Sequence, residues 1–248
     1  LRENGISRSA DGHWVTSGPF TLMTFLNHFL DLVVETKQDQ LKIRVLVTIA
    51  ESVKDYAARL LAKFKDVTAK AAVLKKKSGK EKSGSEAGSL CLELVCAMTN
   101  DAEILLDEVE KIFEDNEEMS GLRYEDDEVE DAYQDAVFAI ISLGQYGVGE
   151  LLRIVFDDLQ DLFKDAFPTT WPSDEQGASI FDLQGELSDT IGDYLNDFGQ
   201  CIKPFFLHKI HTRAATRLST WYLNALFRAR RRTFTSTKSL TLDEKAVP

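Results

Sequence analysis

Apolar residues recur at intervals of three and four positions along most of this 248-residue chain. This spacing places apolar side chains along one side of an α-helix, and it constrains the fold more than any other feature of the sequence. It is found over 19–37, 41–73, 90–113, 127–167, 180–198 and 204–227. Because no run alternates convincingly between apolar and polar residues, we predict an all-α chain of long antiparallel amphipathic helices, stacked as helical bundles in a rod.

The interruptions of this period predict how the chain is divided. Residues 1–18 lack the period and contain several turn formers, so we expect an irregular lead-in, and Pro19 suits the first turn of the first helix. Pro168 and Pro172 mark the clearest break, because proline is not tolerated in a helix interior. We therefore predict a first helical bundle over 19–167, a portion of a second bundle over 168–232, and a frayed tail over 233–248.

Weaker interruptions lie within these bundles. The lysine-, glycine- and serine-rich stretch 75–89 has no apolar anchor and predicts a flexible loop, and 116–127 predicts a connection. Gly144, Gly147 and Gly149 predict a kink or a split in the fourth helical region. In the first helix, the apolar stripe consists of Phe20, Met23, Phe25, Leu26, Phe29, Leu30, Val33 and Val34.

The charges are numerous and unevenly distributed. The formal net charge is -12, which argues against nucleic acid or anionic lipid as the main partner of the whole surface, because phosphate contacts need lysine and arginine. Residues 101–135 carry 16 acids against Lys111 and Arg123, and this stretch either docks a basic partner or is a solvated helix face. The opposite charge gathers at Arg228, Arg230, Arg231 and Arg232. These arginines either contact acidic lipid or an acidic helix of a partner, or they complement the negative end of the last helix.

The three cysteines suggest a reducing compartment. Cys91, Cys96 and Cys201 are an odd number without zinc-like pairing. Cys91 and Cys96 lie five residues apart, which is not a zinc or redox spacing, so we expect these two to be buried thiols. No apolar run approaches the roughly 20 residues that a membrane span needs, so we expect no transmembrane segment. The chain begins at Leu1 and shows no signal peptide, which favours a piece of a longer cytosolic protein.

The sharpest candidate for catalysis is the DDLQD motif of Asp157, Asp158 and Asp161. Clustered carboxylates of this pattern bind Mg²⁺ in helical prenyl-diphosphate enzymes, where the metal holds the diphosphate. The companion motif of those enzymes is absent, and Asp158 and Asp161 lie away from the apolar stripe of Leu152, Val155, Leu159 and Leu162. We therefore interpret the three aspartates as a solvated helix face, with the magnesium-dependent enzyme as the alternative.

Other arrangements give weaker signals for chemistry. His208 and His211 lie three residues apart with Cys201 upstream, and a metal site would need more converging ligands. The loop near Gly79 and Lys80 lacks the pattern of a phosphate-binding loop, and no turn that would present a nucleophile is visible. We accordingly predict a protein that is not an enzyme, with no catalytic, metal-binding or cofactor-binding residues and no cofactor.

A resemblance to a known family is carried by residues 190–227, TIGDYLNDFGQCIKPFFLHKIHTRAATRLSTWYLNALF. They resemble the exocyst complex component 3 family, the Sec-six type subunit of the exocyst. The matching residues are Asp193, Tyr194, Asp197, Phe198, Ile202, Lys203, Pro204, Phe205 and the run Tyr222-Leu223-Asn224-Ala225-Leu226. The stretches 16–32 and 42–60 are similar to further segments of that family, so the resemblance spans about 16–227 and is weak over 75–135.

The resemblance implies a function as well as a fold. It implies a rod of helical bundles of the tethering-complex type, in a non-catalytic subunit that docks secretory vesicles at the plasma membrane before SNARE-mediated fusion. The implied partners are other exocyst subunits and SNARE-related proteins, and the implied location is cytoplasmic, with recruitment to sites of secretion. Family members are several times longer than this chain, and the lysine-rich loop departs from their pattern. A stand-alone SNARE-binding helical adaptor is a further alternative.

Overall fold

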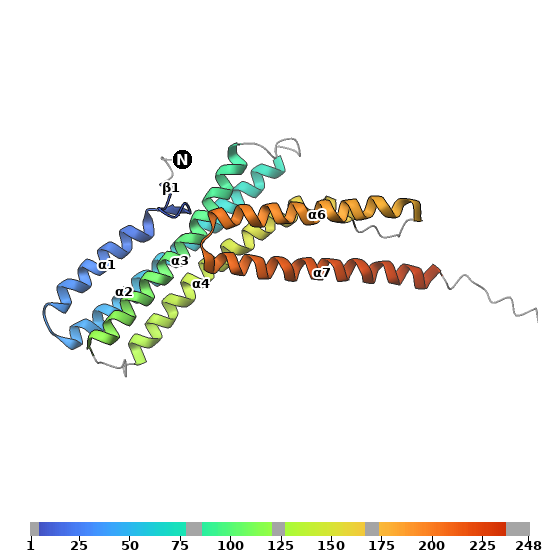
Figure 1. The fold of residues 1–248 in the computed structure, drawn as a ribbon. Helices are drawn as coiled ribbons and strands as arrows, with labels where there is room; N and C mark the ends of the chain where they lie inside the picture. The colour runs from blue at the N-terminus through green and yellow to red at the C-terminus, as the bar shows by residue number, and fades with distance from the viewer. Residues whose placement is uncertain (1–4, 78–85, 121–126, 167–173, 237–248) are drawn as a thin grey trace, which may run out of the picture. The chain divides into compact units, whose positions relative to one another are not determined.

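The computed structural model describes residues 5–77, 86–120, 127–166 and 174–236 of the chain. Two short strands are followed by seven helices in this part of the chain, which confirms the predicted all-α bundle fold (Figure 1). The elements are β1 (Ile6–Arg8), β2 (Trp14–Thr16), α1 (Gly18–Val34), α2 (Asp39–Lys77), α3 (Glu86–Ser120), α4 (Asp127–Asp158), α5 (Gln160–Ala166), α6 (Asp174–Cys201) and α7 (Pro204–Ser236).

The lead-in to the first helix is a β-hairpin, and the prediction of an irregular segment over 1–18 is wrong for this part. β1 and β2 pair antiparallel, with Ile6 opposite Thr16 and Arg8 opposite Trp14. The turn is closed by the N–H of Gly12, which donates to the carbonyl of Ser9 at 2.9 Å, and Gly12 adopts a φ of 86° that favours glycine. Strands of three residues are too short to show a period in the sequence.

The contacts divide the chain into two compact units, which are described separately. The first unit combines Leu1–Leu152 with Asp197–Lys209, and the second combines Arg153–Asn196 with Ile210–Pro248. This division differs from the predicted pair of bundles over 19–167 and 168–232, because α4, α6 and α7 each contribute residues to both units. The predicted boundary at the proline-rich break falls on 167–173, outside the described residues.

In the first unit, α2 and α3 form the centre of a helical bundle. α1 packs against both of them, β2 packs against α3, and α4 joins through aromatic contacts. The ring of Phe64 on α2 meets that of Tyr146 on α4 edge to face at 5.1 Å, and Phe113 on α3 lies 4.8 Å from Tyr133 on α4. The fully buried large side chains of this unit include Leu46, Ile49, Phe64, Leu105, Ile140, Leu143, Leu151, Ile202 and Phe206.

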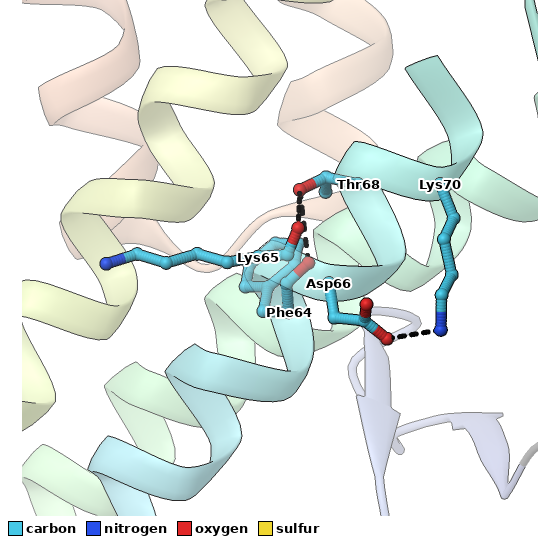
Figure 2. A network of polar contacts seen from close by, with 5 residues as sticks. All are labelled: Phe64, Lys65, Asp66, Thr68 and Lys70. Carbon is cyan, nitrogen blue, oxygen red and sulfur yellow. Dashed lines mark hydrogen bonds and ion pairs between the residues drawn. The ribbon is translucent and has the colours of Figure 1, made fainter. Parts of the chain in front are cut away.

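A polar contact accompanies the aromatic seam between α2 and α4. Thr68 is buried on α2, and its hydroxyl lies 2.7 Å from the hydroxyl of Tyr146. Figure 2 shows the same Thr68 hydroxyl directed back at the carbonyl oxygens of Phe64 and Lys65, beside the Asp66–Lys70 ion pair. The buried hydroxyl therefore has several partners, as burial of a polar group requires.

Gly144 and Gly147 of α4 are sites of close packing, and a split of the helix at these positions, one of the two predicted outcomes, is wrong. α4 runs without interruption from Asp127 to Asp158, and the break falls at Leu159, before α5. A Cβ atom at Gly144 would meet the ring of Phe206, and one at Gly147 would meet the hydroxyl of Thr99. Glycine is thus required by neighbours that are distant in the sequence.

Several helices are longer than the apolar period predicts. α2 extends to Lys77 and α3 begins at Glu86, so both helices enter the predicted loop 75–89, and only 78–85 lies outside the described residues. α3 also continues to Ser120, into the predicted connection 116–127. α7 reaches Ser236, beyond the predicted start of the frayed tail at 233, and residues 237–248 lie outside the described part.

By length and composition alone, α4 is apolar enough to cross a membrane, which differs from the expectation that no segment approaches a membrane span. It is the one such helix among the described residues. Its Ile140, Leu143 and Leu151 are fully buried in the first unit, and Gly144 lies against Phe206. The burial of these residues accounts for part of the apolar composition of α4.

We predict that Gly144→Ala lowers the free energy of unfolding by about 1–3 kcal/mol, because the added methyl group must displace the Phe206 ring in a packed core. Gly149→Ala is the matched control on the same helix, since Gly149 is exposed and no atom lies within 4 Å of its Cβ position. We expect it to raise the free energy of unfolding by about 0.5–1 kcal/mol through helix propensity. Urea unfolding followed by circular dichroism measures both, and equal effects of the two substitutions would contradict the proposed packing.

Candidate protein-interaction surface

The apolar stripe of α1 is divided between two faces of the helix. Met23, Leu26, Leu30 and Val33 are buried against α2 and α3. Phe25, Phe29 and Leu32 are 67%, 42% and 51% exposed. Because these three follow one another at steps of four and three residues, they lie on one face of the helix, beside the buried one. We call this set of three side chains the α1 face.

The α1 face is almost without charge. Within Gly18–Val34, the titratable side chains are His28 and Asp31, and both are exposed on the remaining, polar side of the helix. Single exposed apolar side chains are ordinary, but a contiguous set of large ones on one helix is typical of an interaction site. The chemistry available to this surface is therefore apolar contact, without a group for catalysis or metal binding.

The start of α1 is fixed by a contact between two helices. A Cβ atom at Gly18 would meet the hydroxyl of Tyr56 on α2, so only glycine permits this approach. Burial, together with the nearby charge of Asp101, raises the pKa of Tyr56 to about 12. Pro19 is buried in the first turn, as predicted, where its missing N–H is not needed for the helix.

Asp101 on α3 holds the residue that leads into α1. The backbone N–H of Thr16 donates to its Oδ1 at 2.9 Å, and the hydroxyl of Thr16 donates to its Oδ2 at 2.6 Å. Burial raises the pKa of Asp101 to about 6, while these two hydrogen bonds oppose the shift. The carboxyl group thus joins α3 to β2, directly before the helix that carries the α1 face.

Asn100 joins α3 to two other parts of the first unit. Its Nδ2 donates to the carbonyl oxygens of Trp14 at 2.8 Å and of Cys201 at 2.7 Å. Its Oδ1 accepts the backbone N–H of Lys203 at 2.9 Å. The side chain is fully buried, and three hydrogen bonds satisfy it there. One amide therefore connects the hairpin, α3 and the turn between α6 and α7.

Glu103 supplies the hydrogen-bond acceptors for the start of α7. The backbone N–H groups of Phe205 and Phe206 donate to its two carboxylate oxygens at 3.4 and 3.3 Å. These N–H groups belong to the first turn of a helix, where they have no partner within the helix and where negative charge is favoured. Burial raises the pKa of Glu103, and the two N–H groups oppose that shift.

The acidic stretch 101–135 is thus not uniform. Asp101 and Glu103 are buried and bind backbone groups, so for these two residues both predicted interpretations, a basic docking site and a solvated face, are wrong. Asp107, Glu110 and Glu114 are exposed on the rest of α3. Burial, with the charges of Asp107 and Glu114, raises the pKa of Glu110. Sequence reasoning missed the buried pair, although the run Thr99-Asn100-Asp101 interrupts an otherwise apolar stretch of α3.

The aspartates of the DDLQD motif each have a separate partner. Asp157 pairs with Arg153 at 3.1 Å, and Asp161 pairs with Lys164 at 3.0 Å. The hydroxyl of Tyr194 donates to Asp158 at 3.0 Å. All three aspartates are exposed, and α4 ends at Asp158, so the motif is divided between two helices. Within the described residues, no group of three His, Cys, Asp or Glu side chains is placed to hold a metal ion, and this includes His208 and His211.

The position of the arginines at 228–232 within α7 contradicts one of their two predicted interpretations. Their side chains lie outside the described residues, but α7 continues through them to Ser236, with no basic residue in its last turn. Their interpretation as charges that complement the end of the helix is therefore wrong, since that effect is confined to the last turn. Contact with acidic lipid or an acidic helix stays a prediction.

A comparison with protein families and a comparison with solved structures each found a match. A family model described as "Exocyst complex component Sec6" matches residues 2–245. A similar solved structure is described as the crystal structure of the C-terminal domain of the exocyst subunit Sec6p. The sequence identity is 15% and the TM-score is 0.71, and the match covers 98% of this chain and 64% of the solved chain. This chain thus spans less than two thirds of that structure. No curated protein matches the sequence.

We predict that Asp101→Asn changes how stability depends on pH. The folded-state pKa of about 6 lies above the ordinary value of 3.8, so the folded state takes up the proton first as the pH falls. The contribution of Asp101 to the free energy of unfolding is therefore full below about pH 4 and is lost as the pH rises through about 6, a change on the order of 2–3 kcal/mol. The asparagine variant should lack it.

The measurement is urea unfolding of both proteins between about pH 4 and 7. The stability of the natural protein relative to Asp101→Asn should be greater at the acidic end of this range. Asp107→Asn, an exposed position on the same helix, is the control. A constant difference between the natural protein and Asp101→Asn across this range would show that Asp101 does not titrate in a buried site.

Proposed function

The chain belongs to the exocyst complex component Sec6 family, and from this premise we propose that it is a non-catalytic part of a vesicle-tethering subunit. Family membership over 2–245 is the observation that carries the proposal. The described residues support it, because DDLQD does not form a convergent carboxylate site and because apolar surface is left on the outside of the bundle. Long packed helices suit a protein that holds partners at a distance.

At a finer level, we propose that the subunit acts in docking secretory vesicles at the plasma membrane before SNARE-mediated fusion. Its partners in this role are other exocyst subunits and SNARE-related proteins, and it acts in the cytoplasm at sites of secretion. The support is the family, whose description names a component of the exocyst complex. Such a component needs surfaces that recognise other proteins more than it needs a chemical site.

We propose that the α1 face docks a helix of another subunit of the same complex. Phe25 and Leu32 expose more than half of their surface, and apolar area of this kind is stabilised when a partner removes it from water. A partner that presents charged groups to this face would leave those groups without hydrogen bonds. An amphipathic helix that brings apolar side chains at steps of three and four residues fits the ridge of α1.

The same surface is held in position by the core beside it. The contacts of Thr16 with Asp101 and of Gly18 with Tyr56 place the first turn of α1. Buried Met23, Leu26 and Leu30 then set the rotation of the helix. Because the orientation of α1 is determined before any partner binds, docking does not have to order this helix, and less conformational entropy is lost.

The proposal predicts that Phe25→Glu weakens assembly of the complex. In cells that express the full-length protein, affinity purification of the variant should recover other exocyst subunits at least about five-fold less than the natural protein, because a buried apolar anchor contributes more than about 1 kcal/mol. The free energy of unfolding should stay within about 0.5 kcal/mol, because the side chain is exposed.

Thr24→Glu is the matched control, since it adds the same charge one residue away, on the polar side of α1. We expect this variant to recover the other subunits at the natural level. Equal recovery by Phe25→Glu and the natural protein would refute the role of the α1 face but not the family assignment. If the natural protein itself recovered no exocyst subunit, the proposed function would fail.

A further inference from the structure

Two cysteines that are distant in the sequence belong to the same part of the first unit. Cys96 lies on α3 and is buried, as predicted, while Cys201 is the last residue of α6 and is partly exposed. Both are free thiols. The remaining cysteine, Cys91, lies on α3 one turn before Cys96, and its side chain is outside the described residues.

The hydrogen bonds of Asn100 place the two thiols near each other. Its Nδ2 lies 2.7 Å from the carbonyl oxygen of Cys201, so the backbone of Cys201 contacts this side chain. Cys96 precedes Asn100 by four residues on α3, and the Cβ atoms of such neighbours lie on one face of a helix, about 5–6 Å apart. Helical side chains also lean towards the N-terminus, which is the direction of Cys96 from Asn100. Cys201 therefore lies beside the turn of α3 that carries Cys96.

The electrostatic surroundings of the thiols agree with this placement. Burial raises the pKa of Cys96 to about 12, and the neighbouring Cys201 thiol adds to the shift. Burial also raises the pKa of Cys201, while the charge of Arg8 and a hydrogen bond from the side chain of Trp14 oppose the shift. Of the two thiols, Cys201 is thus the one that reaches solvent and has groups beside it that favour the thiolate, the form that reacts with oxidants.

Two carboxylates favour the protonated form of the pair. The charges of Asp197 and Glu93 add to the raised pKa of Cys201, and the charge of Glu93 adds to that of Cys96. Near neutral pH both groups therefore rest as thiols and react slowly, because only the small thiolate fraction is nucleophilic. The pair stays reduced until an oxidant is present.

We propose that Cys96 and Cys201 are a redox-sensitive pair, which a hydroperoxide converts into a disulfide between α3 and the end of α6. The thiolate of Cys201 attacks one oxygen of the peroxide, the O–O bond breaks, and Cys201 becomes a sulfenic acid. The sulfur of Cys96 then attacks that of Cys201, the S–O bond breaks, and the oxygen leaves as water with the proton of Cys96. With hydrogen peroxide, the two thiols give up two electrons and two hydrogen atoms, and two molecules of water form.

The disulfide has a mechanical consequence for the first unit. Asn100 and Glu103 hold the turn after α6 and the start of α7 through hydrogen bonds to Lys203 and Phe206. Hydrogen bonds alone allow this junction to open and close, whereas a covalent bond at Cys201 keeps the end of α6 on α3. Oxidation therefore fixes the junction in its closed arrangement. This inference does not depend on the α1 face or on the proposed function.

The test treats the purified, reduced 248-residue chain with hydrogen peroxide and stops the reaction with acid. We expect the intact mass to fall by that of two hydrogen atoms, and a peptic digest to give two peptides joined through Cys96 and Cys201. The midpoint of urea unfolding should rise by roughly 1 M, because the bond closes a loop of about 100 residues in the unfolded chain. Dithiothreitol should reverse all three changes.

Cys91→Ser is the matched control on α3. Five residues turn about 140° around a helix and advance about 7.5 Å, so Cys91 and Cys96 cannot pair while α3 is intact. We expect Cys91→Ser to form the disulfide as the natural chain does, and Cys201→Ser to keep its hydrogen atoms and its urea midpoint. The digest of the natural chain identifies the pairing directly, so the test does not depend on how a variant folds.

Several outcomes would overturn the proposal. They are a disulfide that includes Cys91, a dimer linked through Cys201, a sulfenic or higher acid that persists at Cys201 without a disulfide, and a natural chain that peroxide leaves unchanged.

Discussion

The hydrogen bonds of one buried asparagine and two buried carboxylates hold the first unit together. Asn100, Asp101 and Glu103 lie in the middle of α3, in a buried stretch that is otherwise apolar apart from Thr99. Burying a polar side chain is unfavourable unless it forms hydrogen bonds. Each of these three side chains therefore requires particular hydrogen-bond partners beside it. Between them they bind the hairpin, the turn after α6 and the first turn of α7. The apolar core stabilises this arrangement, and the polar side chains select it from other packings.

The helices around this junction show how buried contacts can determine which residues of a helix are available for recognition. α1 buries one apolar face and exposes another, and α7 attaches through Trp221 while Leu223 and Phe227 remain outside. In both helices, the buried contacts determine which residues are presented outwards. Recognition by such a protein depends on the orientation of whole helices. Substitutions in the core can therefore alter binding at positions they do not touch.

The helical period is sufficient to predict the fold class, because burial along a helix repeats locally. The predicted start of α1 near Pro19 and of α7 at Pro204 is confirmed for the same reason, since proline acts on its own turn. The resemblance to the Sec-six type subunit is likewise confirmed by the family match over 2–245. What the sequence could not reveal depends on contacts between distant residues. Gly144 predicts a kink or a split from the sequence alone, whereas the structure places it against the ring of Phe206.

The candidate surfaces were harder to predict than the fold for a related reason. Periodicity identifies Phe25 and Met23 equally as apolar helix residues, and only the position of α2 and α3 distinguishes an exposed residue from a core residue. The arginines at 228–232 were attributed in part to a helix end, because the apolar stripe stops near residue 227 while the helix does not. Short polar runs such as Asn100-Asp101 gave a visible signal, but charge counting placed Asp101 on an acidic surface.

The three-way connection made by Asn100 also bears on the order in which the first unit can form during synthesis. Its partners lie 86 residues before it, at Trp14, and 101 and 103 residues after it, at Cys201 and Lys203. A growing chain that has just completed α3 contains this amide while two of its three hydrogen-bond partners have not yet been synthesised. Closing such distant contacts is slow, because the entropy of a long loop is lost before the contact forms. Completion of this unit therefore waits for the start of α7 to leave the ribosome, however early α1, α2 and α3 become helical.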